Sequence, residues 1–308
     1  MTAFIELSLG EDSAVISETG AALLSYTVGG RPVVVAMEAF DGAVLAPWPN
    51  RIAGGRFEFD GRSHQLPISE PELNTALHGL VAHREWTVSE HAEHSVTLTT
   101  DINPEEGYPF HFGLTVTYTL QEETISVAAL ARNLGNDRAP FGFGFHPWIH
   151  PGADTVDEAQ LVIPAQTWFP VDEHLIPTQE RPFDDGTVIP ADHEADESAC
   201  IVCKDFRALR ILGDTCLDDA FGSPRPGRDG WSWARLKGAD DRTVVIGMDS
   251  AFRAWQACSG DELGHGLSRS AIAIEPMTCP PNAFAAGSDF DVIDPGQTLE
   301  ALWSIGLH

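Results

Sequence analysis

The chain has 308 residues, 43% of them hydrophobic, which is enough to build a large buried core. Its 46 acidic and 18 basic residues give a net charge of −28, which repels nucleic acid phosphates and anionic membranes, so neither is expected as a partner. No apolar run approaches the roughly 20 residues of a membrane span, and no basic segment opens the chain, so a cytoplasmic location is expected.

Short runs that alternate apolar and polar residues recur along the chain and predict β-strands. In chain order, the clearest runs are 57–62, 95–100, 114–120, 124–131 and 243–248. The first contains Asp60-Gly61, a strong hairpin signal. Glycine and proline punctuate these runs, and no window predicts a long amphipathic helix. We therefore expect an all-β fold, a large antiparallel β-sandwich, with residues 1–308 forming a single domain.

Five cysteines in a chain of this length do not predict a disulfide framework. Cys200 and Cys203 have the spacing of a redox or zinc pair, but no second pair and no histidine pair follows them. We interpret them as two buried thiols of one strand. No other motif has metal-ligand or phosphate-loop spacing, so no metal site is expected.

An apolar run from Ala271 ends in Glu275, and Pro276 follows directly. Proline lacks a backbone donor, so we expect the strand to end there. A carboxylate at the end of a buried strand is costly unless something uses or pairs it. The position suits a rigidly held general base that faces a cleft.

Phenylalanine and glycine alternate over residues 141–145, and His146-Pro147-Trp148 follows. We expect this alternation to give a flat, aromatic-lined cleft that ends in His146, which suits the C–H faces of a sugar ring. A core strand whose histidine bonds to the backbone remains the alternative for this segment.

Three further segments combine polar residues with turn residues. Arg51, after Pro47-Trp-Pro-Asn50, presents a planar donor fork suited to hydroxyls, or it stacks on Trp48 or pairs with an acid. His78, before Gly79, fits a structural role as well as a functional one. Asp218 and Asp219 form an acidic pair before Phe221. Adjacent carboxylates of this kind are also typical of a solvated turn.

Taken in order, these segments resemble the aldose 1-epimerase (mutarotase) family, over roughly residues 45 to 285. The matching residues are Asn50-Arg51-Ile52 with Gly55 and Phe57, Leu77-His78-Gly79, His146-Pro147, Asp218 with Phe221, and Glu275-Pro276-x-Thr278-x-x-x-Asn282-Ala283-Phe284. The resemblance implies a β-supersandwich that interconverts the α and β anomers of free hexoses without a cofactor.

By that resemblance, Glu275 is the general base and His146 the general acid, with neighbouring acids expected to favour the charged form of His146. The residues expected to bind the monosaccharide or to line its binding site are Asn50, Arg51, His78, Trp148 and Asp218. Arg253 falls near a position where galactose-type members resemble one another in carrying glutamine, which leaves the preferred sugar open.

Other functions remain open from the sequence. A hexose-6-phosphate 1-epimerase would need clustered arginines, for which Arg207 with Arg210, or Arg225 with Arg228, are the candidates. A non-catalytic carbohydrate-binding module would not need an acid–base pair. A glycosidase would need a second carboxylate about 5–9.5 Å away, with Asp218 as the candidate. The chain is expected to be a monomer or a homodimer.

Overall fold

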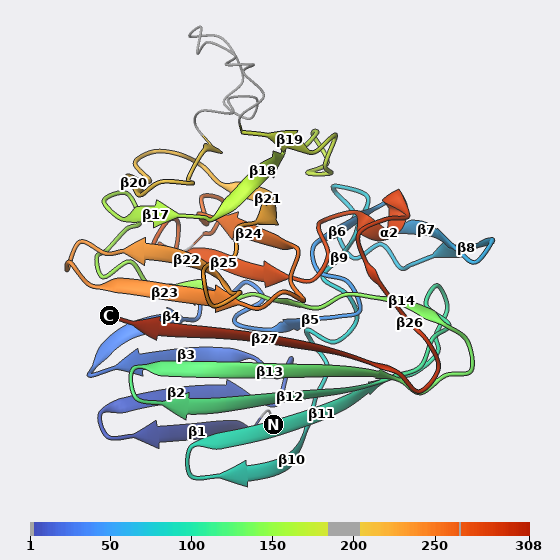
Figure 1. Cartoon of the computed structure of the whole chain (residues 1–308), viewed down its shortest axis with the longest axis horizontal. Helices are drawn as coiled ribbons and strands as arrows, with labels where there is room; N and C mark the ends of the chain where they lie inside the picture. The colour runs from blue at the N-terminus through green and yellow to red at the C-terminus, as the bar shows by residue number, and fades with distance from the viewer. Residues whose placement is uncertain (1–2, 184–203, 265) are drawn as a thin grey trace, which may run out of the picture.

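The regular secondary structure of the described residues consists almost entirely of antiparallel strands, as Figure 1 shows. The computed structural model describes residues 3–183, 204–264 and 266–308. The predicted all-β class is confirmed, while Cys200 and Cys203 lie outside the described residues. Among the described residues, no helix is both long and apolar enough to cross a membrane.

The first sheet carries the N-terminal strands at one end. Its order is β1 (Phe4–Leu9), β2 (Asp12–Ser17), β3 (Leu23–Val28), β4 (Arg31–Val35), β16 (Trp148–Ile149), β25 (Ile272–Met277), β24 (Ala254–Cys258), β21 (Asp218–Pro224), β18 (Ala165–Phe169) and β19 (Arg181–Pro182). A short branch joins β15 (Gly144–Phe145) to β25 and to β5 (Val44–Leu45). Strands far apart in the sequence therefore meet in the middle of this sheet.

The second sheet contains most of the strands with clean alternation. Its order is β10 (Thr87–Ala92), β11 (Ser95–Ile102), β12 (Phe112–Gln121), β13 (Thr124–Asn133), β27 (Thr298–Leu307), β23 (Thr243–Met248), β22 (Ser232–Lys237), β17 (Gln160–Val162) and β20 (Arg210–Ile211). Strands β11, β12, β13 and β23 confirm four predicted runs. Along β12, buried and half-buried residues alternate up to Leu120, as expected for a strand with one face on the core.

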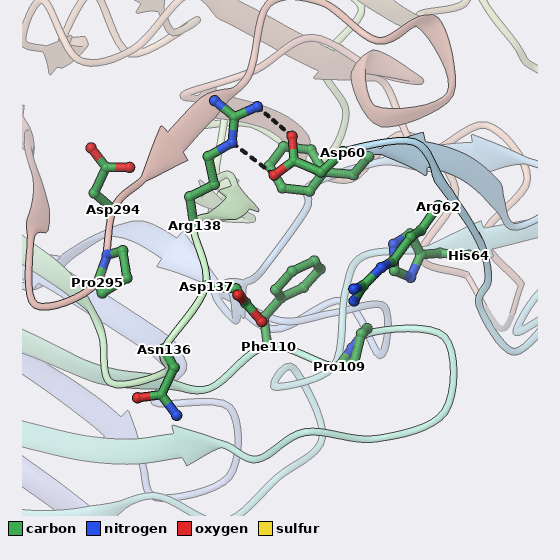
Figure 2. A pocket seen from close by; sticks show the side chains of 11 residues that line it. Asp60, Arg62, His64, Pro109, Phe110, Asn136, Asp137, Arg138, Asp294 and Pro295 are labelled. Atoms are coloured by element: carbon green, nitrogen blue, oxygen red, sulfur yellow. Dashed lines mark hydrogen bonds and ion pairs between the residues drawn. The ribbon is translucent and has the colours of Figure 1, made fainter.

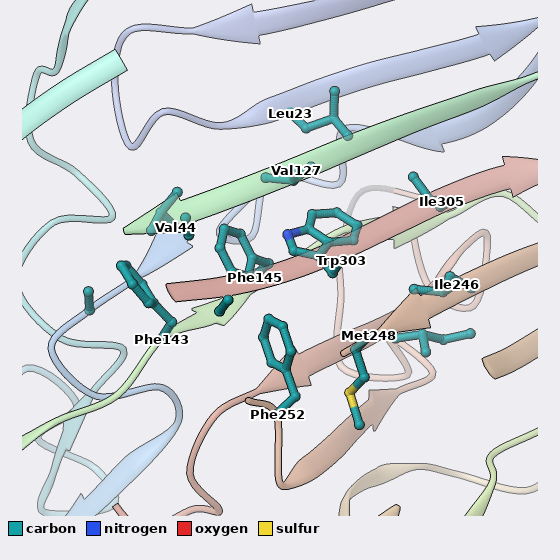
Figure 3. Close-up of a cluster of buried hydrophobic side chains, with 14 of the residues drawn as sticks. Leu23, Val44, Val127, Phe143, Phe145, Ile246, Met248, Phe252, Trp303 and Ile305 are labelled. Atoms are coloured by element: carbon teal, nitrogen blue, oxygen red, sulfur yellow. The ribbon is translucent and has the colours of Figure 1, made fainter. Parts of the chain in front are cut away.

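The two sheets enclose one large hydrophobic cluster (Figure 3). Trp303 of β27, Ile246 of β23 and Val127 of β13 meet Phe145 of β15 and Leu23 of β3. The Tyr118 hydroxyl of β12 donates to the carbonyl of Ala21 across the layers, at 2.6 Å. Full burial of each large apolar side chain stabilises the fold by about 1.5–3 kcal/mol.

Small elements gather at one end of the sandwich (Figure 1). They are the pairs β6 (Arg51–Ala53) with β9 (Thr75–Leu77), β7 (Arg56–Phe59) with β8 (Arg62–Gln65), and β14 (Ala139–Phe141) with β26 (Asp291–Ile293), and the helix α2 (Ala283–Ala286). The β7–β8 hairpin turns at Asp60-Gly61, as predicted.

One predicted boundary is wrong, because β25 continues through Pro276 to Met277. Pro276 pairs in register with Trp255 of β24 on one side. On the other side the neighbouring strand is itself interrupted, between β15 and β16, at His146 and Pro147. A residue without a backbone donor is tolerated beside such a break.

Candidate functional site

Glu275 and His146 face each other at the interruption between β15 and β16. His146 directly follows β15 and Glu275 lies on β25, so the sheet brings two residues distant in sequence together. The distance from His146 Nε2 to Glu275 Oε1 is 3.5 Å. Rigid strands on both sides hold this pair, which we name the dyad.

The dyad lines a cavity of about 360 Å³, which we name the central cavity. This size falls in the range of small-molecule sites. All the residues that the sequence predicted for the site line it: Asn50, Arg51, His78, His146, Trp148, Asp218 and Glu275. They come from β6 and the residue before it, from β16, β21 and β25, and from the segments that follow β9 and β15.

Burial sets the protonation of the dyad. Glu275 is 2% exposed and His146 6%. Burial, and next the charge of Asp218, raise the pKa of Glu275 well above its usual value. Burial lowers the pKa of His146 to about 4, although the charges of Asp218 and Asp41 oppose the shift. The expectation of a charged His146 is therefore wrong, because desolvation outweighs the nearby acids.

The dyad also has unused hydrogen-bonding capacity. Among the described residues, His146 Nδ1 and Glu275 Oε2 are buried without a hydrogen-bond partner. An unpaired buried polar atom costs about 1–3 kcal/mol, so a ligand that supplies hydroxyls would relieve a real penalty. Such an arrangement can support proton transfer to and from a bound polar molecule.

Arg51 and Asp218 form a charged wall of the central cavity. Arg51 Nη1 donates to Asp218 Oδ2 at 3.3 Å, and its Nε and Nη2 donate to the two carboxylate oxygens of Glu70 at 2.8 and 3.0 Å. Gln256 Nε2 donates to Asp218 Oδ1 at 2.7 Å. Pairing with acids, and not stacking on Trp48, is thus the arrangement of Arg51.

His78 is held as a neutral donor. The backbone N–H of Asn50 donates to His78 Nδ1 at 3.1 Å, so the proton of a neutral ring lies on Nε2. Burial, followed by the charges of His146, Arg51 and His83, lowers the pKa of His78 well below its usual value. Gly79 allows this position, because a Cβ there would lie 2.2 Å from the Ala46 carbonyl oxygen.

The aromatic wall of the central cavity differs from the predicted one. Phe40 contacts His78 edge-on at 4.5 Å between ring centroids, and Trp148 lies 5.3 Å from His146. Phenylalanines 141, 143 and 145 instead point into the core between the sheets, where all three are fully buried. The intervening glycines are needed for close packing, because a Cβ at Gly144 would lie 2.5 Å from Pro49.

The residues after Glu275 attach its strand to the rest of the site. Thr278 Oγ1 accepts from the backbone N–H of Phe143 at 2.8 Å, three residues before His146. Asn282 donates its backbone N–H to the Arg51 carbonyl at 2.8 Å and accepts from the Ala53 N–H at 2.9 Å. The spacing Glu275-x-x-Thr278-x-x-x-Asn282 therefore fixes the dyad and Arg51 relative to each other.

Sequence reasoning missed Glu70, Phe40 and Gln256. Glu70 precedes Pro71, the same carboxylate–proline pair as Glu275-Pro276, but polar neighbours hid it. Gln256 is a polar residue inside the apolar strand β24 and pairs in register with Glu275. Arg253 does not line the central cavity; it donates to Asp291 and to the Thr278 carbonyl.

Asp219 forms hydrogen bonds with buried side chains of the core and does not line the central cavity. It accepts from Trp168 Nε1 at 2.8 Å and from Lys204 Nζ at 2.7 Å, while its neighbour Asp218 reaches the central cavity. The pair is therefore not a solvated turn. In the part of the chain that the structure describes, no group of three or more His, Cys, Asp or Glu side chains is arranged to hold a metal ion.

A second cavity, of about 510 Å³, lies at the β7–β8 hairpin, and we name it the hairpin cavity (Figure 2). Asp60 accepts two hydrogen bonds from Arg138 there, and His64, Phe110 and Asp294 also line it. No residue predicted for the site belongs to it.

The chain resembles known proteins along its whole length. The family model described as Aldose 1-epimerase matches residues 4–305. The uncharacterized protein YihR of Escherichia coli (strain K12) is 33% identical over 309 residues, which cover 98% of this chain and 92% of YihR. The galactose mutarotase of Homo sapiens is 32% identical over 149 residues, which cover 46% of this chain and 42% of that protein.

Solved structures share the fold. The crystal structure of a GalM/aldose epimerase homologue from C. elegans superposes with a TM-score of 0.82 at 19% identity, covering 100% of this chain and 99% of that one. Galactose 1-epimerase from Lactobacillus acidophilus has a TM-score of 0.77 at 17% identity, covering 100% and 98%. At such identities the likeness concerns the fold alone.

Proposed function

The chain belongs to the aldose 1-epimerase family, and from that premise we propose that it interconverts the α and β anomers of free hexoses of the glucose or galactose type. The observation that carries the proposal is the buried dyad, with 3.5 Å between His146 Nε2 and Glu275 Oε1 in a cavity of about 360 Å³. An acid–base pair of this kind is what the opening of a hemiacetal requires.

In the proposed reaction, Glu275 removes the proton of the C1 hydroxyl while His146 gives a proton to the ring oxygen. The bond between C1 and the ring oxygen breaks, and an acyclic aldehyde forms. Rotation about C1–C2 exposes the other face of the aldehyde. The ring closes when the freed hydroxyl oxygen attacks C1. His146 takes back the proton of that hydroxyl, and Glu275 returns its own to the aldehyde oxygen, which becomes the new C1 hydroxyl.

Ring opening moves one proton onto Glu275 and one off His146. The neutral dyad that burial favours is therefore the protonation state that accompanies the open-chain sugar. The cyclic sugar needs the charged dyad instead. Its hydroxyls offer hydrogen bonds to His146 and Glu275, which offset part of the desolvation that disfavours those charges.

The other residues of the central cavity would bind the sugar. Arg51 and the Nε2–H of His78 are donors, Asp218 is an acceptor, and Trp148 offers an apolar face for the ring. Asn50 borders the same space, although its side-chain oxygen accepts from the Arg51 N–H at 2.8 Å. Alternating donors and acceptors around an aromatic wall suit a neutral monosaccharide.

The structure gives little support to a phosphorylated substrate. Of the arginines in the described residues, Arg51 is the one that lines the central cavity, and two carboxylates already engage it. The candidate pairs Arg207 with Arg210 and Arg225 with Arg228 are absent from this lining.

The match over residues 4–305 also supports treating the chain as one functional unit.

The experiment is mutarotation of freshly dissolved α-D-glucose, α-D-galactose and glucose 6-phosphate, followed by polarimetry or NMR. We expect acceleration for at least one free hexose. Acceleration of the phosphate alone would transfer the function to hexose-6-phosphate epimerisation. No acceleration of any of the three would overturn the proposal in favour of a carbohydrate-binding module.

A further inference from the structure

We propose that Glu70 is a positioning residue that fixes Arg51 for sugar binding and keeps it from closing fully onto Asp218. The inference rests on the proposed function of the central cavity. Neither the family motif nor the dyad includes Glu70, which lies in the loop between β8 and β9. It nevertheless borders the cavity and makes a bidentate contact with Arg51.

The contact is well suited to set an orientation. Glu70 binds the edge of the guanidinium formed by Nε and Nη2, at 2.8 and 3.0 Å. Bidentate pairs between arginine and carboxylate fix the plane of the guanidinium as well as its place. This leaves Nη1 for Asp218, at the longer distance of 3.3 Å. Glu70 and Asp218 therefore share one guanidinium, and Glu70 has the stronger hold.

Glu70 is itself anchored by the strand pair that carries the site. Its Oε2, which accepts from Arg51 Nε, also accepts from the hydroxyl of Thr75 at 2.6 Å, and its backbone exchanges two hydrogen bonds with Thr75. Thr75 is fully buried on β9, opposite Ala53 of β6. Strand β6 begins at Arg51 and β9 ends just before His78. One short sheet thus aligns the anchor, the arginine and a second donor of the cavity.

The contact also keeps Glu70 charged. Burial works to raise the pKa of Glu70, but the hydrogen bonds from Arg51 and Thr75 and the charge of Arg51 outweigh it, so the pKa lies below its usual value. The side chains of Arg51 and Glu70 are 11% and 18% exposed, so water screens the pair incompletely. Without Glu70, the nearest carboxylate for Arg51 is Asp218, and a full pairing there would withdraw a donor and an acceptor from the sugar.

The test compares Glu70→Gln with Glu72→Gln, an exposed carboxylate two residues away with no ion pair in the described residues. We expect E70Q to raise KM about tenfold to a hundredfold with a much smaller change in kcat, since misplaced binding groups act at this scale. E72Q should match the wild type. Thr75→Val, which removes one anchor, should show the same pattern more weakly, and thermal melts should show each variant to be folded.

A double-mutant cycle separates positioning from a general structural role. If Glu70 acts through Arg51, E70Q should add nothing to the KM of R51A. Wild-type KM for E70Q, or additive effects in the double variant, would overturn the inference. Binding of D-galactose, measured by NMR, tests the role of Glu70 in sugar binding independently of catalysis. Weakened binding in E70Q alongside an inactive wild type would sink the epimerase proposal alone, while unchanged binding would sink the role of Glu70.

Discussion

The central cavity and the hairpin cavity contain similar residue types but hold them in opposite environments. Each has a bidentate ion pair of arginine with a carboxylate, histidine and aromatic side chains. The side chains of Arg51 and Glu70 are 11% and 18% exposed, whereas those of Arg138 and Asp60 are 55% and 40% exposed. The hairpin cavity is the larger of the two, at about 510 against 360 Å³.

The difference shows that burial, and not volume, gives side chains unusual chemistry. In the central cavity, desolvation raises the pKa of Glu275 and lowers that of His146, so that burial favours the neutral pair over the charged pair. At the hairpin cavity the pair of Asp60 and Arg138 stands in water, where such contacts contribute little. His64 is the one group there with an unpartnered buried atom, and it stacks on Phe57.

The largest expected effect is the loss of the dyad. Glu275→Gln and His146→Asn should each lower kcat about 10²–10⁴-fold, because each removes one positioned proton transfer. Polarimetric rates at saturating hexose measure the effect. Glu90→Gln and His91→Asn, exposed residues of the edge strand β10, are matched controls and should leave the rate unchanged. Normal mutarotation in either dyad variant would contradict the assignment of the catalytic pair.

Local pattern predicted the strands, because alternation records which face of a strand is buried. The runs that became β11, β12, β13 and β23, and the turn at Asp60, needed nothing beyond their own residues. The end of β15 also has a local signal, since Pro147 follows two residues after its last residue, Phe145.

Pairing between distant strands was beyond the reach of the same reasoning. Strand β25 passes through Pro276 because its neighbour happens to be broken there, and no local pattern near Pro276 records that neighbour. Phenylalanines 141, 143 and 145 are buried in the core, although their alternation with glycine predicted a cleft lined by aromatic side chains. The charge of His146 depended on a burial that composition does not reveal, so a strongly acidic chain still holds a neutral histidine.

A second prediction concerns the dependence of stability on pH. His146 has a pKa of about 4 in the folded chain against 6.5 when unfolded, so below pH 6.5 the unfolded state binds a proton that the folded state refuses. The wild type should therefore lose stability relative to His146→Asn as the pH falls from 6.5 to about 4. A shift of this size corresponds to roughly 3 kcal/mol. Urea denaturation of both proteins across that range measures it.

Glu275 should give the opposite slope. Its pKa is raised on folding, so the stability that it contributes is complete below its unfolded pKa and is lost as the pH rises toward the folded value. The wild type should lose stability relative to Glu275→Gln as the pH increases. Parallel slopes for H146N and E275Q would show that desolvation does not set the protonation of the dyad.

The smallest expected effect is at the hairpin cavity. Asp60, at the exposed tip of the β7–β8 hairpin, is the ion-pair partner of Arg138 (Figure 2). Asp60→Asn removes this ion pair, but water and salt can replace the lost contact at such an exposed position. The urea midpoint and the mutarotation rate should therefore both stay at the wild-type values, in contrast to E70Q, which breaks a similar but buried pair. A fall in kcat/KM on D60N comparable to that of E70Q would show that the hairpin cavity takes part in the reaction, and burial would no longer distinguish the two cavities.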